Sequence, residues 1–346
     1  MFSGKENVSF GVLCLLAGCI STSSCLIHLQ AKNIGVLLMM FWCFTGLVNK
    51  GINALAFNNS LRLAWTLGCD LSAIIERTWQ FGLCCSALCV LQRLEGIASL
   101  RQAHSTVWDR KRRLLIDFGV GLGLPALQIP MFFIVQPYRL NVIENIGCSA
   151  PLYASVPALF IYHLWRLLVS LVCAVYAVLV LRWFMLRRRQ FTAALSAQHS
   201  GLSQKKYFRL FALAICERVL VSAGQFYVII QSLQIGGLLP YTSWAEVHTN
   251  FNRILFVPVD TIAHSSLLSL SILRWFSLTP AMALFVFFGL TEEAQSVYKA
   301  RWKALINLCS SKGKKQTDGR ESLDLEAFES HGSKFSVLVQ RDTVIC

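Results

Sequence analysis

Long apolar segments alternate with short polar ones along this chain, and that pattern constrains its fold more than any other feature. A bilayer core of roughly 30 Å takes about 20 residues of helix to cross. Seven segments reach that length, and the last of them contains Pro280, which a bundled membrane helix tolerates. They cover residues 8–29, 34–57, 67–91, 114–135, 157–183, 210–233 and 269–290. The sequence therefore predicts an all-α membrane protein, a seven-transmembrane-helix bundle.

Composition supports a membrane protein and argues against a nucleic-acid-binding one. Hydrophobic residues make up 55% of the 346 and charged residues 14%, which is too apolar for a soluble domain of this length. The net charge of +14 comes from basic residues placed between apolar segments, not from a soluble basic face. The first segment also fits a signal peptide, because Lys5 precedes it and small residues follow at Ser21–Ser24, but its length favours a retained span.

The basic residues of the loops predict the orientation of the bundle. Positive side chains resist translocation, so cytoplasmic loops collect Lys and Arg. The loops at 30–33, 92–113 and 182–209 hold 14 of them, whereas the other side holds four. Those four are Lys5, Arg62, Arg139 and Arg253. We therefore expect the N-terminus outside and the C-terminus in the cytosol.

Two kinds of covalent modification are expected on the external side. The triplets that begin at Asn7 and Asn58 are N-glycosylation acceptors, and both fall there. Two of the thirteen cysteines, Cys69 and Cys148, also reach the oxidising lumen, where a close pair should form a disulfide. Cys309 and Cys346 are cytosolic, and nine cysteines in the apolar segments should act as small hydrophobes. The nine are Cys14, Cys19, Cys25, Cys43, Cys84, Cys85, Cys89, Cys173 and Cys216.

The chain divides at the end of the last apolar segment. Residues 291–308 can form a charged helix along the inner membrane surface, and the polar stretch after them is expected to be disordered. We predict a seven-helix transmembrane bundle with this amphipathic helix over residues 1–308 and a cytosolic tail over 309–346.

Ionisable residues inside the apolar segments are the first candidates for function, because each is costly at the bilayer centre unless it is paired or hydrated. One reading is a ligand cavity open to the outside. The other is a set of internal ion pairs that join helices, such as Arg166 with Glu76 or Glu217. The set consists of Lys50, Glu76, Arg77, Asp117, Arg166, Glu217 and Arg218.

Catalytic and metal-binding motifs are missing from the sequence. There is no phosphate-binding loop, zinc-protease helix, serine-hydrolase elbow or Cys-x-x-Cys pair, and the seven histidines are scattered. We therefore expect no enzyme activity, no metal and no cofactor. A transporter that uses the intramembrane charges stays an alternative, although no internal repeat supports it.

Specific strings suggest a family. IVQPYRLNVIENIGC at 134–148 and SGLSQKKYFRLFALA at 200–214 resemble the fungal receptors for lipidated, a-factor-type mating pheromones, the class D G-protein-coupled receptors. The resemblance continues in PYTSWAEVHTNFNRI at 240–254 and FFGLTEEA at 287–294. Rhodopsin-like receptors fit less well, because Leu91-Gln92-Arg93-Leu94 stands where they have Asp-Arg-Tyr.

This resemblance implies a multi-pass plasma-membrane receptor. It would bind a farnesylated peptide pheromone outside and activate a heterotrimeric G protein inside, with membrane lipid and a possible homodimer as further partners. An orphan receptor-like protein without a mating pheromone is the other alternative.

The resemblance and the charge pattern together suggest two sets of contact residues. A structural role is the alternative for two of the ligand candidates, because Trp244 could lie on a buried loop ledge and His248 could cap a short helix. The basic residues of the cytosolic side could contact anionic lipid instead of a G protein. The ligand set is Lys50, Glu76, Arg77, Arg166, Trp244, His248 and Arg253. The G-protein set is Arg93, Arg110, Arg112, Arg113, Arg187, Arg188, Arg189, Lys205, Lys206 and Arg209.

Overall fold

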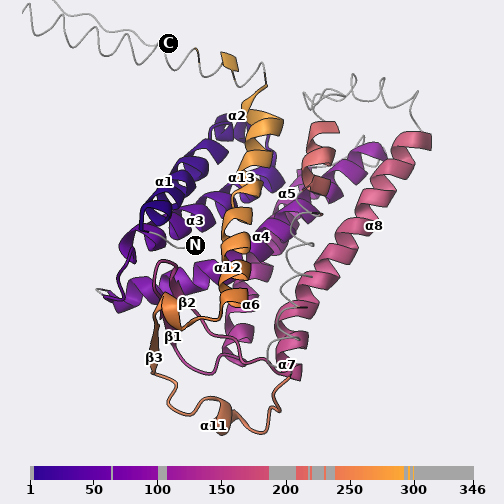
Figure 1. Cartoon of the computed structure of the whole chain (residues 1–346). Coiled ribbons are helices and arrows are strands. Elements are labelled where there is room, and N and C mark those ends of the chain that lie inside the picture. Colours follow the sequence, from indigo (N-terminus) through magenta and orange to yellow (C-terminus); the bar gives the residue numbers. More distant parts are fainter. Residues whose placement is uncertain are drawn as a thin grey trace, which may run out of the picture. The chain divides into compact units, whose positions relative to one another are not determined.

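The structure of the protein is a computed structural model (Figure 1). The chain divides into two units, Met1–Ala294 and Gln295–Cys346. The first unit carries the membrane helices. In the second unit, three residues are described. The described residues are 4–63, 65–99, 107–186, 208–216, 219, 230, 238–291, 295, 296 and 299.

Six helices of the described residues are long and apolar enough to cross a membrane. They match six of the seven predicted spans, with bounds that differ by several residues. The remaining predicted span, 210–233, is the sixth along the chain and lies mostly outside the described residues, although 208–216 is helical. The six are Gly4–Gln30, Ile34–Ala56, Thr66–Ala98, Val107–Phe133, Val156–Leu186 and Ser266–Gly289.

The first span is interrupted, and side-chain hydroxyls explain where. Helix α1 (Gly4–Ser21) ends at a serine- and threonine-rich turn before α2 (Cys25–Gln30). Ser21 Oγ donates to Gly18 O at 2.7 Å and Thr22 Oγ1 to Cys19 O at 2.9 Å. Such bonds compete with the backbone ladder and turn the chain.

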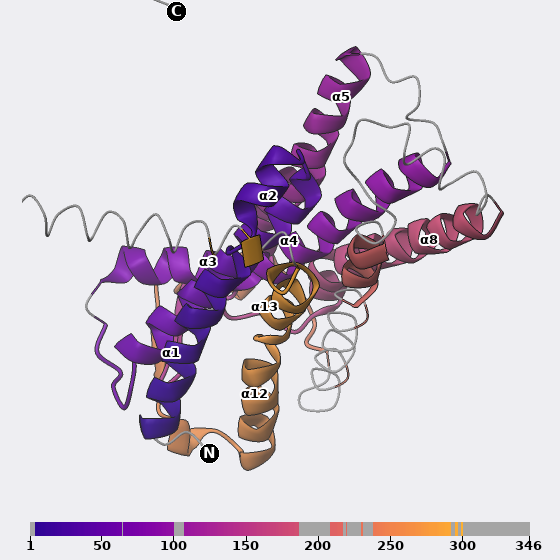
Figure 2. The ribbon, with the colours of Figure 1, turned by 90° about the horizontal axis from the view of Figure 1, so that it is seen from above.

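Helix α4 (Thr66–Ala98) forms the centre of the bundle. In its most apolar stretch 89% of the residues are buried, against 22% in the span at 156–186. Seen from above, α3 (Ile34–Ala56) and α4 lie in the middle, with α1 on one side and α8 (Trp165–Leu186) on the other (Figure 2).

Two glycines let α3 and α4 approach closely. A Cβ on Gly46 of α3 would lie 2.5 Å from the Trp79 ring of α4, and a Cβ on Gly82 of α4 would collide with the Trp42 ring of α3. Each helix therefore seats a tryptophan over a glycine of its neighbour. Small residues at such contacts are what membrane helices use to pack.

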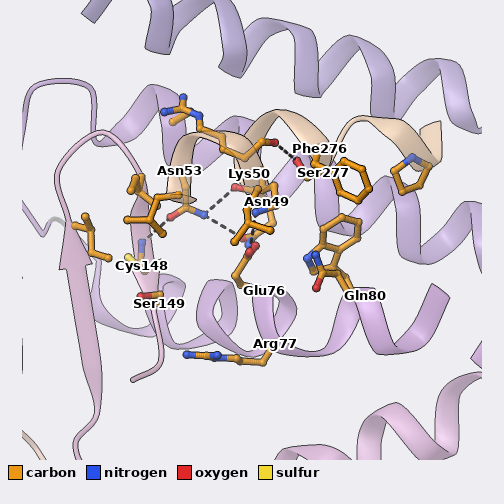
Figure 3. Close-up of a pocket in the computed structure, with 18 of the residues that line it drawn as sticks. Asn49, Lys50, Asn53, Glu76, Arg77, Gln80, Cys148, Ser149, Phe276 and Ser277 are labelled. Atoms are coloured by element: carbon orange, nitrogen blue, oxygen red, sulfur yellow. Dashed lines mark hydrogen bonds and ion pairs between the residues drawn. The ribbon is translucent and has the colours of Figure 1, made fainter. Parts of the chain in front are cut away.

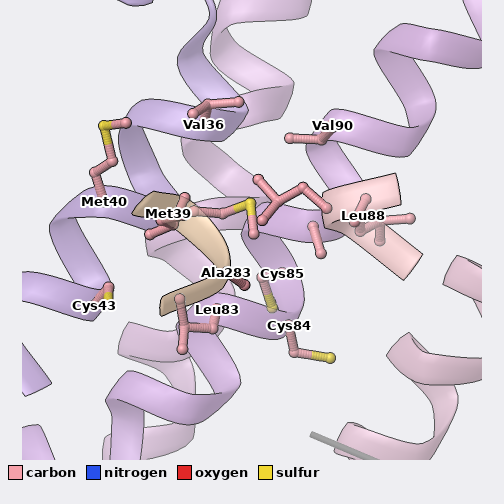
Figure 4. Close-up of a cluster of buried hydrophobic side chains, with 14 of the residues drawn as sticks. Val36, Met39, Met40, Cys43, Leu83, Cys84, Cys85, Leu88, Val90 and Ala283 are labelled. Atoms are coloured by element: carbon pink, nitrogen blue, oxygen red, sulfur yellow. The ribbon is translucent and has the colours of Figure 1, made fainter. Parts of the chain in front are cut away.

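Buried cysteines fill the core between these helices, as the sequence predicted. Cys43, Cys84 and Cys85 lie among methionine, leucine and valine side chains (Figure 4). The nine cysteines predicted to act as small hydrophobes form no disulfide among the described residues, and six of them are buried. They act as small hydrophobes there.

The fourth and fifth spans contain π-helical segments next to prolines. Segment η1 (Gly119–Gly123) joins α5 (Val107–Phe118) to α6 (Leu124–Phe133), and η2 (Leu159–Leu164) joins α7 (Val156–Ala158) to α8. Pro125 has no N–H for the carbonyl four residues earlier, Gly121 O. Trp42 Nε1 donates to that oxygen at 2.9 Å, so the proline's lost bond is replaced from α3.

Loops at one end of the bundle form a small sheet that the sequence did not predict. Strands β1 (Leu140–Ile143) and β2 (Gly147–Ser149) make a hairpin, and β3 (Ile254–Val257) pairs with β1 in parallel. Figure 1 shows this sheet and the short helix α11 (Trp244–Val247) at one end, with α2 at the other. The 3-10 turn η3 (Val259–Thr261) precedes the last span, which consists of α12 (His264–Phe276), α13 (Thr279–Leu284) and π segment η4 (Phe285–Gly289).

Candidate functional site

A cavity of about 350 Å³ lies beneath the sheet, within the bundle. Residues of α1, α3, α4, the β1–β2 hairpin, η2, α8, α12 and α13 line it. Four of the predicted ligand residues, Lys50, Glu76, Arg77 and Arg166, are among the lining residues. These four charged residues of the apolar segments therefore lie around one cavity, and their contact with a ligand stays a prediction.

Lys50 and Glu76 form an ion pair across α3 and α4 (Figure 3). Lys50 Nζ lies 2.6 Å from Glu76 Oε1, and the side chains are 18% and 29% exposed. The ammonium also lies 5.8 Å from the centre of the Trp79 ring. A partly buried pair in this setting is screened less than a surface pair.

Arg166 has a different environment from the one that the sequence suggested. Its Nη2 donates to Arg77 O at 2.8 Å and to the Tyr162 hydroxyl at 2.7 Å, and its guanidinium lies 4.3 Å from the Tyr162 ring centre. Because Glu76 is paired with Lys50, the suggested Arg166–Glu76 pair is wrong. The other suggested partner, Glu217, lies outside the described residues, as does Arg218.

Arg77 links the cavity to the hairpin loop. Its Nη2 donates to Ala150 O, just after β2. The guanidinium also lies 4.8 Å from the Phe132 ring centre and 5.7 Å from that of Tyr162. Arg77 and Arg166 thus lie against the same tyrosine ring, and cation–π contacts supply part of their environment.

Asparagines join α3 to the turn of the hairpin. Asn53 Oδ1 accepts from Cys148 N at 3.0 Å, while its Nδ2 donates to Ser72 Oγ at 2.6 Å. Asn145, in the hairpin turn at φ 63°, accepts from Asn59 N at 2.8 Å. Positive φ is a conformation that asparagine and glycine adopt more readily than most residues, and Asn145 with Gly147, at φ 102°, was the local signal for the turn.

Arg274 of α12 belongs to the same hydrogen-bond network, and it was not among the predicted site residues. It donates to Asn7 Oδ1 and, at 3.3 Å, to Asn145 O, and it lies 4.0 Å from the Phe10 ring centre. Arg274 is the sixth residue of the last predicted span, 269–290, so the cost of an intramembrane charge could have identified it.

The same network argues against the predicted glycosylation of Asn7. Asn7 is 1% exposed, and its Nδ2, the atom that a glycan would modify, donates to Ala54 O at 2.7 Å. A sugar at that nitrogen would have to break this bond and enter the packed core. Asn58 is half-buried, and its glycosylation stays a prediction.

Trp244, His248 and Arg253 lie apart from the cavity. Trp244 and His248 stack with ring centres 3.8 Å apart, beside Phe133 and Phe251 at the end of α6. His248 caps the C-terminal end of α11, which agrees with the structural role considered for it. Its backbone N–H and its ring Nδ1 both lie within hydrogen-bond distance of Trp244 O. Trp244 is 50% exposed and so is not buried. Arg253 lies 4.7 Å from the Tyr138 ring centre.

An apolar groove of about 420 Å³ lies between α4 and α6, next to these aromatic residues. Its walls include Ile74, Ile129, Phe132, Phe133 and Phe251. Arg77 lines both this groove and the charged cavity. The two hollows therefore share one charged side chain.

The predicted disulfide is present and is reinforced by an ion pair. Cys69 and Cys148 are bonded, with a Cα–Cα distance of 5.3 Å. Next to it, Arg139 binds Asp70 through two nitrogens, at 2.6 and 3.1 Å. The hydrogen bond to Asp70 raises the pKa of Arg139 above its ordinary value. Both links tie the loop of β1 and β2 to the start of α4.

The predicted G-protein contacts are described in part. Arg93 donates to Lys32 O at 2.5 Å and to Ala31 O at 3.4 Å, which joins α4 to the loop before α3. Arg110 and Arg112 are exposed on α5, while Arg113 and Arg209 are half-buried. The remaining five residues, Arg187, Arg188, Arg189, Lys205 and Lys206, lie outside the described residues.

No metal site is found among the described residues, where no three His, Cys, Asp or Glu side chains lie as metal ligands would.

Comparison with known proteins identifies the family. The family model for STE3, Pheromone A receptor, matches residues 9–307. The chain is 33% identical over 279 residues to the Pheromone B alpha 1 receptor of Schizophyllum commune, covering 80% of this chain and 43% of that protein. It therefore spans less than half of that relative's length.

Two further relatives carry similar names. Pheromone receptor 1 of Ustilago hordei is 31% identical, covering 81% of this chain and 79% of that protein. The Pheromone a factor receptor of Saccharomyces cerevisiae is 23% identical, covering 83% of this chain and 60% of that protein. A family model that matches most of the chain, together with six apolar helices, identifies a multi-pass membrane protein. The chain belongs to the STE3 family of pheromone A receptors, which is a family of receptors and not of enzymes.

Proposed function

We propose that this protein is a G-protein-coupled receptor of the plasma membrane for a farnesylated peptide mating pheromone. The observation that carries the proposal is the charged cavity of about 350 Å³, roofed by a disulfide-linked hairpin, in a chain of this family. A concave site in which polar and charged groups converge beside apolar side chains is suited to binding a ligand.

The proposed topology has seven spans, with the N-terminus outside and the C-terminus in the cytosol. The excess of basic residues on one side supports this orientation, and residues 210–233 would supply the seventh span. A bundle over residues 1–308 and a cytosolic tail over 309–346 are part of the same proposal, and a homodimer stays a prediction.

Two features support a ligand that is both polar and lipidated. The cavity offers Lys50, Glu76, Arg77 and Arg166 to a peptide. The groove between α4 and α6 has hydrocarbon walls that suit an isoprenoid chain, and Trp244, His248 and Arg253 belong to the loop that carries Phe251 of that groove. Burying a lipid chain there would gain about 0.8 kcal/mol for each CH₂ removed from water, although a chain that leaves the bilayer gains less.

The ligand is tested by expression in yeast that lacks its own receptor of this type, with a pheromone-pathway reporter. We expect at least one member of a panel of farnesylated peptides to raise the reporter signal, and the same peptide without its farnesyl group to be weaker. Filling the groove by Ile129→Trp should reduce the advantage of the farnesyl group, whereas Val178→Trp, at an exposed site of α8, should not.

Two other outcomes would contradict the proposal. Reporter activity that no peptide changes would favour an orphan receptor-like protein. Ligand-independent solute flux would favour a transporter.

Coupling to a G protein is proposed for the inner basic residues, whose charge would complement an acidic partner. Neutralising Arg187, Arg188 and Arg189 together should reduce signalling while surface abundance and peptide binding stay unchanged. A C-terminal tag that remains cytosolic controls for altered insertion. An unchanged reporter signal under those conditions would reject this role.

A further inference from the structure

Four buried nitrogens in the cavity lack a hydrogen-bond partner among the described residues. They are Arg77 Nε, Trp79 Nε1, His163 Nδ1 and Arg166 Nε, and all four side chains line the cavity. Trp79, His163 and Arg166 are 1%, 4% and 6% exposed. Leaving a buried donor without a hydrogen bond costs free energy. Several such nitrogens around one cavity therefore point to a ligand that forms hydrogen bonds with them.

The chemistry of these nitrogens selects the kind of ligand. An arginine Nε and an indole Nε1 can only donate, and His163 Nδ1 donates in one of its tautomers. Three obligatory donors therefore face the cavity, and they require an acceptor from the ligand. A ligand group that is itself a donor would add to the unmatched set.

The charge of the lining residues points the same way. Lys50, Arg77, Arg166 and Arg274 are positive, and Glu76 is the carboxylate among the described lining residues. Glu76 is paired with Lys50 at 2.6 Å, which leaves the two arginines beside Tyr162 without a carboxylate in the part of the chain that the structure describes. A buried charge needs a partner of opposite sign to offset its desolvation.

Arg77 and Arg166 are close enough to bind one anion. Arg166 donates to the Arg77 carbonyl at 2.8 Å, and the guanidinium carbons lie 5.7 and 4.3 Å from the centre of the same Tyr162 ring. Charge-assisted bonds from guanidinium to carboxylate are among the strongest in proteins. Their strength would increase in this partly enclosed, low-dielectric site.

We infer that the cavity binds a carboxylate of the peptide ligand between Arg77 and Arg166. The inference rests on the proposed function and specifies it, because it requires an acidic side chain or a free terminal carboxylate in the activating peptide. Arg77 also donates to Ala150 O, just after β2. An anion bound to Arg77 would therefore contact a side chain that also binds the backbone at the end of the β1–β2 hairpin. Arg77 and Arg166 are thus specificity-determining residues for an acidic ligand.

The first test compares matched peptides on cells. Replacing the acidic side chain of an activating peptide by its amide isostere should raise the half-maximal concentration about tenfold or more for the unaltered receptor. Esterifying a free terminal carboxylate is the parallel arm, and the arm with the larger loss identifies which carboxylate binds. In Arg77→Gln and Arg166→Gln receptors, the acidic and neutral peptides should become nearly equal in potency.

Matched variants separate a lost contact from a lost fold. Arg62→Gln removes an exposed arginine of the loop before α4 and should keep the full preference for the acidic peptide. If a glutamine variant does not reach the surface, Arg166→Lys keeps the charge and should keep a reduced preference. A peptide with lysine at the acidic position should recover potency on Arg166→Glu. Equal potency of acidic and neutral peptides on the unaltered receptor would overturn the inference.

A second test does not depend on signalling. Purified receptor is melted with N-acetyl-aspartate amide, or with N-acetyl-asparagine amide as the neutral match. The anionic probe should raise the melting temperature of the unaltered protein and of Arg62→Gln, but not of Arg77→Gln or Arg166→Gln. Stabilisation without any reporter response would overturn the proposed pheromone function and keep the anion site. Equal effects of both probes would overturn the anion site, whatever the reporter shows.

Discussion

Lys50 and Glu76 join α3 to α4 through an ion pair of 2.6 Å at the cavity wall. Removing one partner leaves a partly buried charge without compensation. We expect Lys50→Met or Glu76→Gln alone to cost about 1–3 kcal/mol, between the values for exposed and fully buried pairs. The double variant should be more stable than the sum of the single effects predicts. Thermal melting of the four purified proteins measures this coupling, and additive effects would show that the pair contributes nothing.

The packing of α3 on α4 depends on the absence of a side chain at Gly46. Because a Cβ there would lie 2.5 Å from the Trp79 ring, Gly46→Ala should displace the tryptophan and cost about 1–3 kcal/mol. Gly119→Ala is the matched control, because no atom other than those of its chain neighbours and its own helix backbone lies within 4 Å of the added Cβ, and it should be neutral or slightly stabilising. Melting temperatures of both variants test the contact, and equal losses would contradict it.

The Cys69–Cys148 bond should behave as one unit. Cys69→Ser and Cys148→Ser should impair surface abundance or peptide response to the same extent, and the double variant should be no worse than either. The loop-entropy relation gives about 4 kcal/mol for a soluble chain, and less is expected here because the membrane already restricts the unfolded state. The bond would be disproved if both thiols in surface protein reacted with an alkylating reagent before reduction.

Glycosylation should distinguish the two acceptor triplets. Ser9→Ala and Ser60→Ala each remove one triplet without changing the asparagine itself. Because Asn7 is buried and bonded to Ala54, we expect the endoglycosidase-sensitive mass shift to disappear in Ser60→Ala and to persist in Ser9→Ala. Gel mobility with and without the enzyme measures this. A shift that disappears in Ser9→Ala would mean that Asn7 leaves its core position during synthesis.

Local rules determined the membrane helices and part of the site. Segment length identified six described spans because crossing a bilayer requires a fixed run of apolar residues. The cost of an intramembrane charge selected Lys50, Glu76, Arg77 and Arg166, which all line the cavity. Compartment and position along the chain selected Cys148 and Cys69, at the start of its span, because nine other cysteines of the spans and the two expected in the cytosol were set aside.

The tertiary structure decided which of these groups meet. The position of a charge along a span gives its depth in the membrane, but not the direction that its side chain faces around the helix axis. Depth alone therefore could not show that the partner of Glu76 is Lys50 rather than Arg166. The loop sheet pairs β1 with a strand more than 100 residues away, and no local pattern encodes that contact. Asn7 looked like an exposed glycan acceptor, and only the packing of α1 against α3 and the hairpin turn shows it to be a buried hydrogen-bonding group. The sequence determines the free-energy cost of placing a residue in a membrane, whereas the residue with which it pairs depends on how distant segments pack.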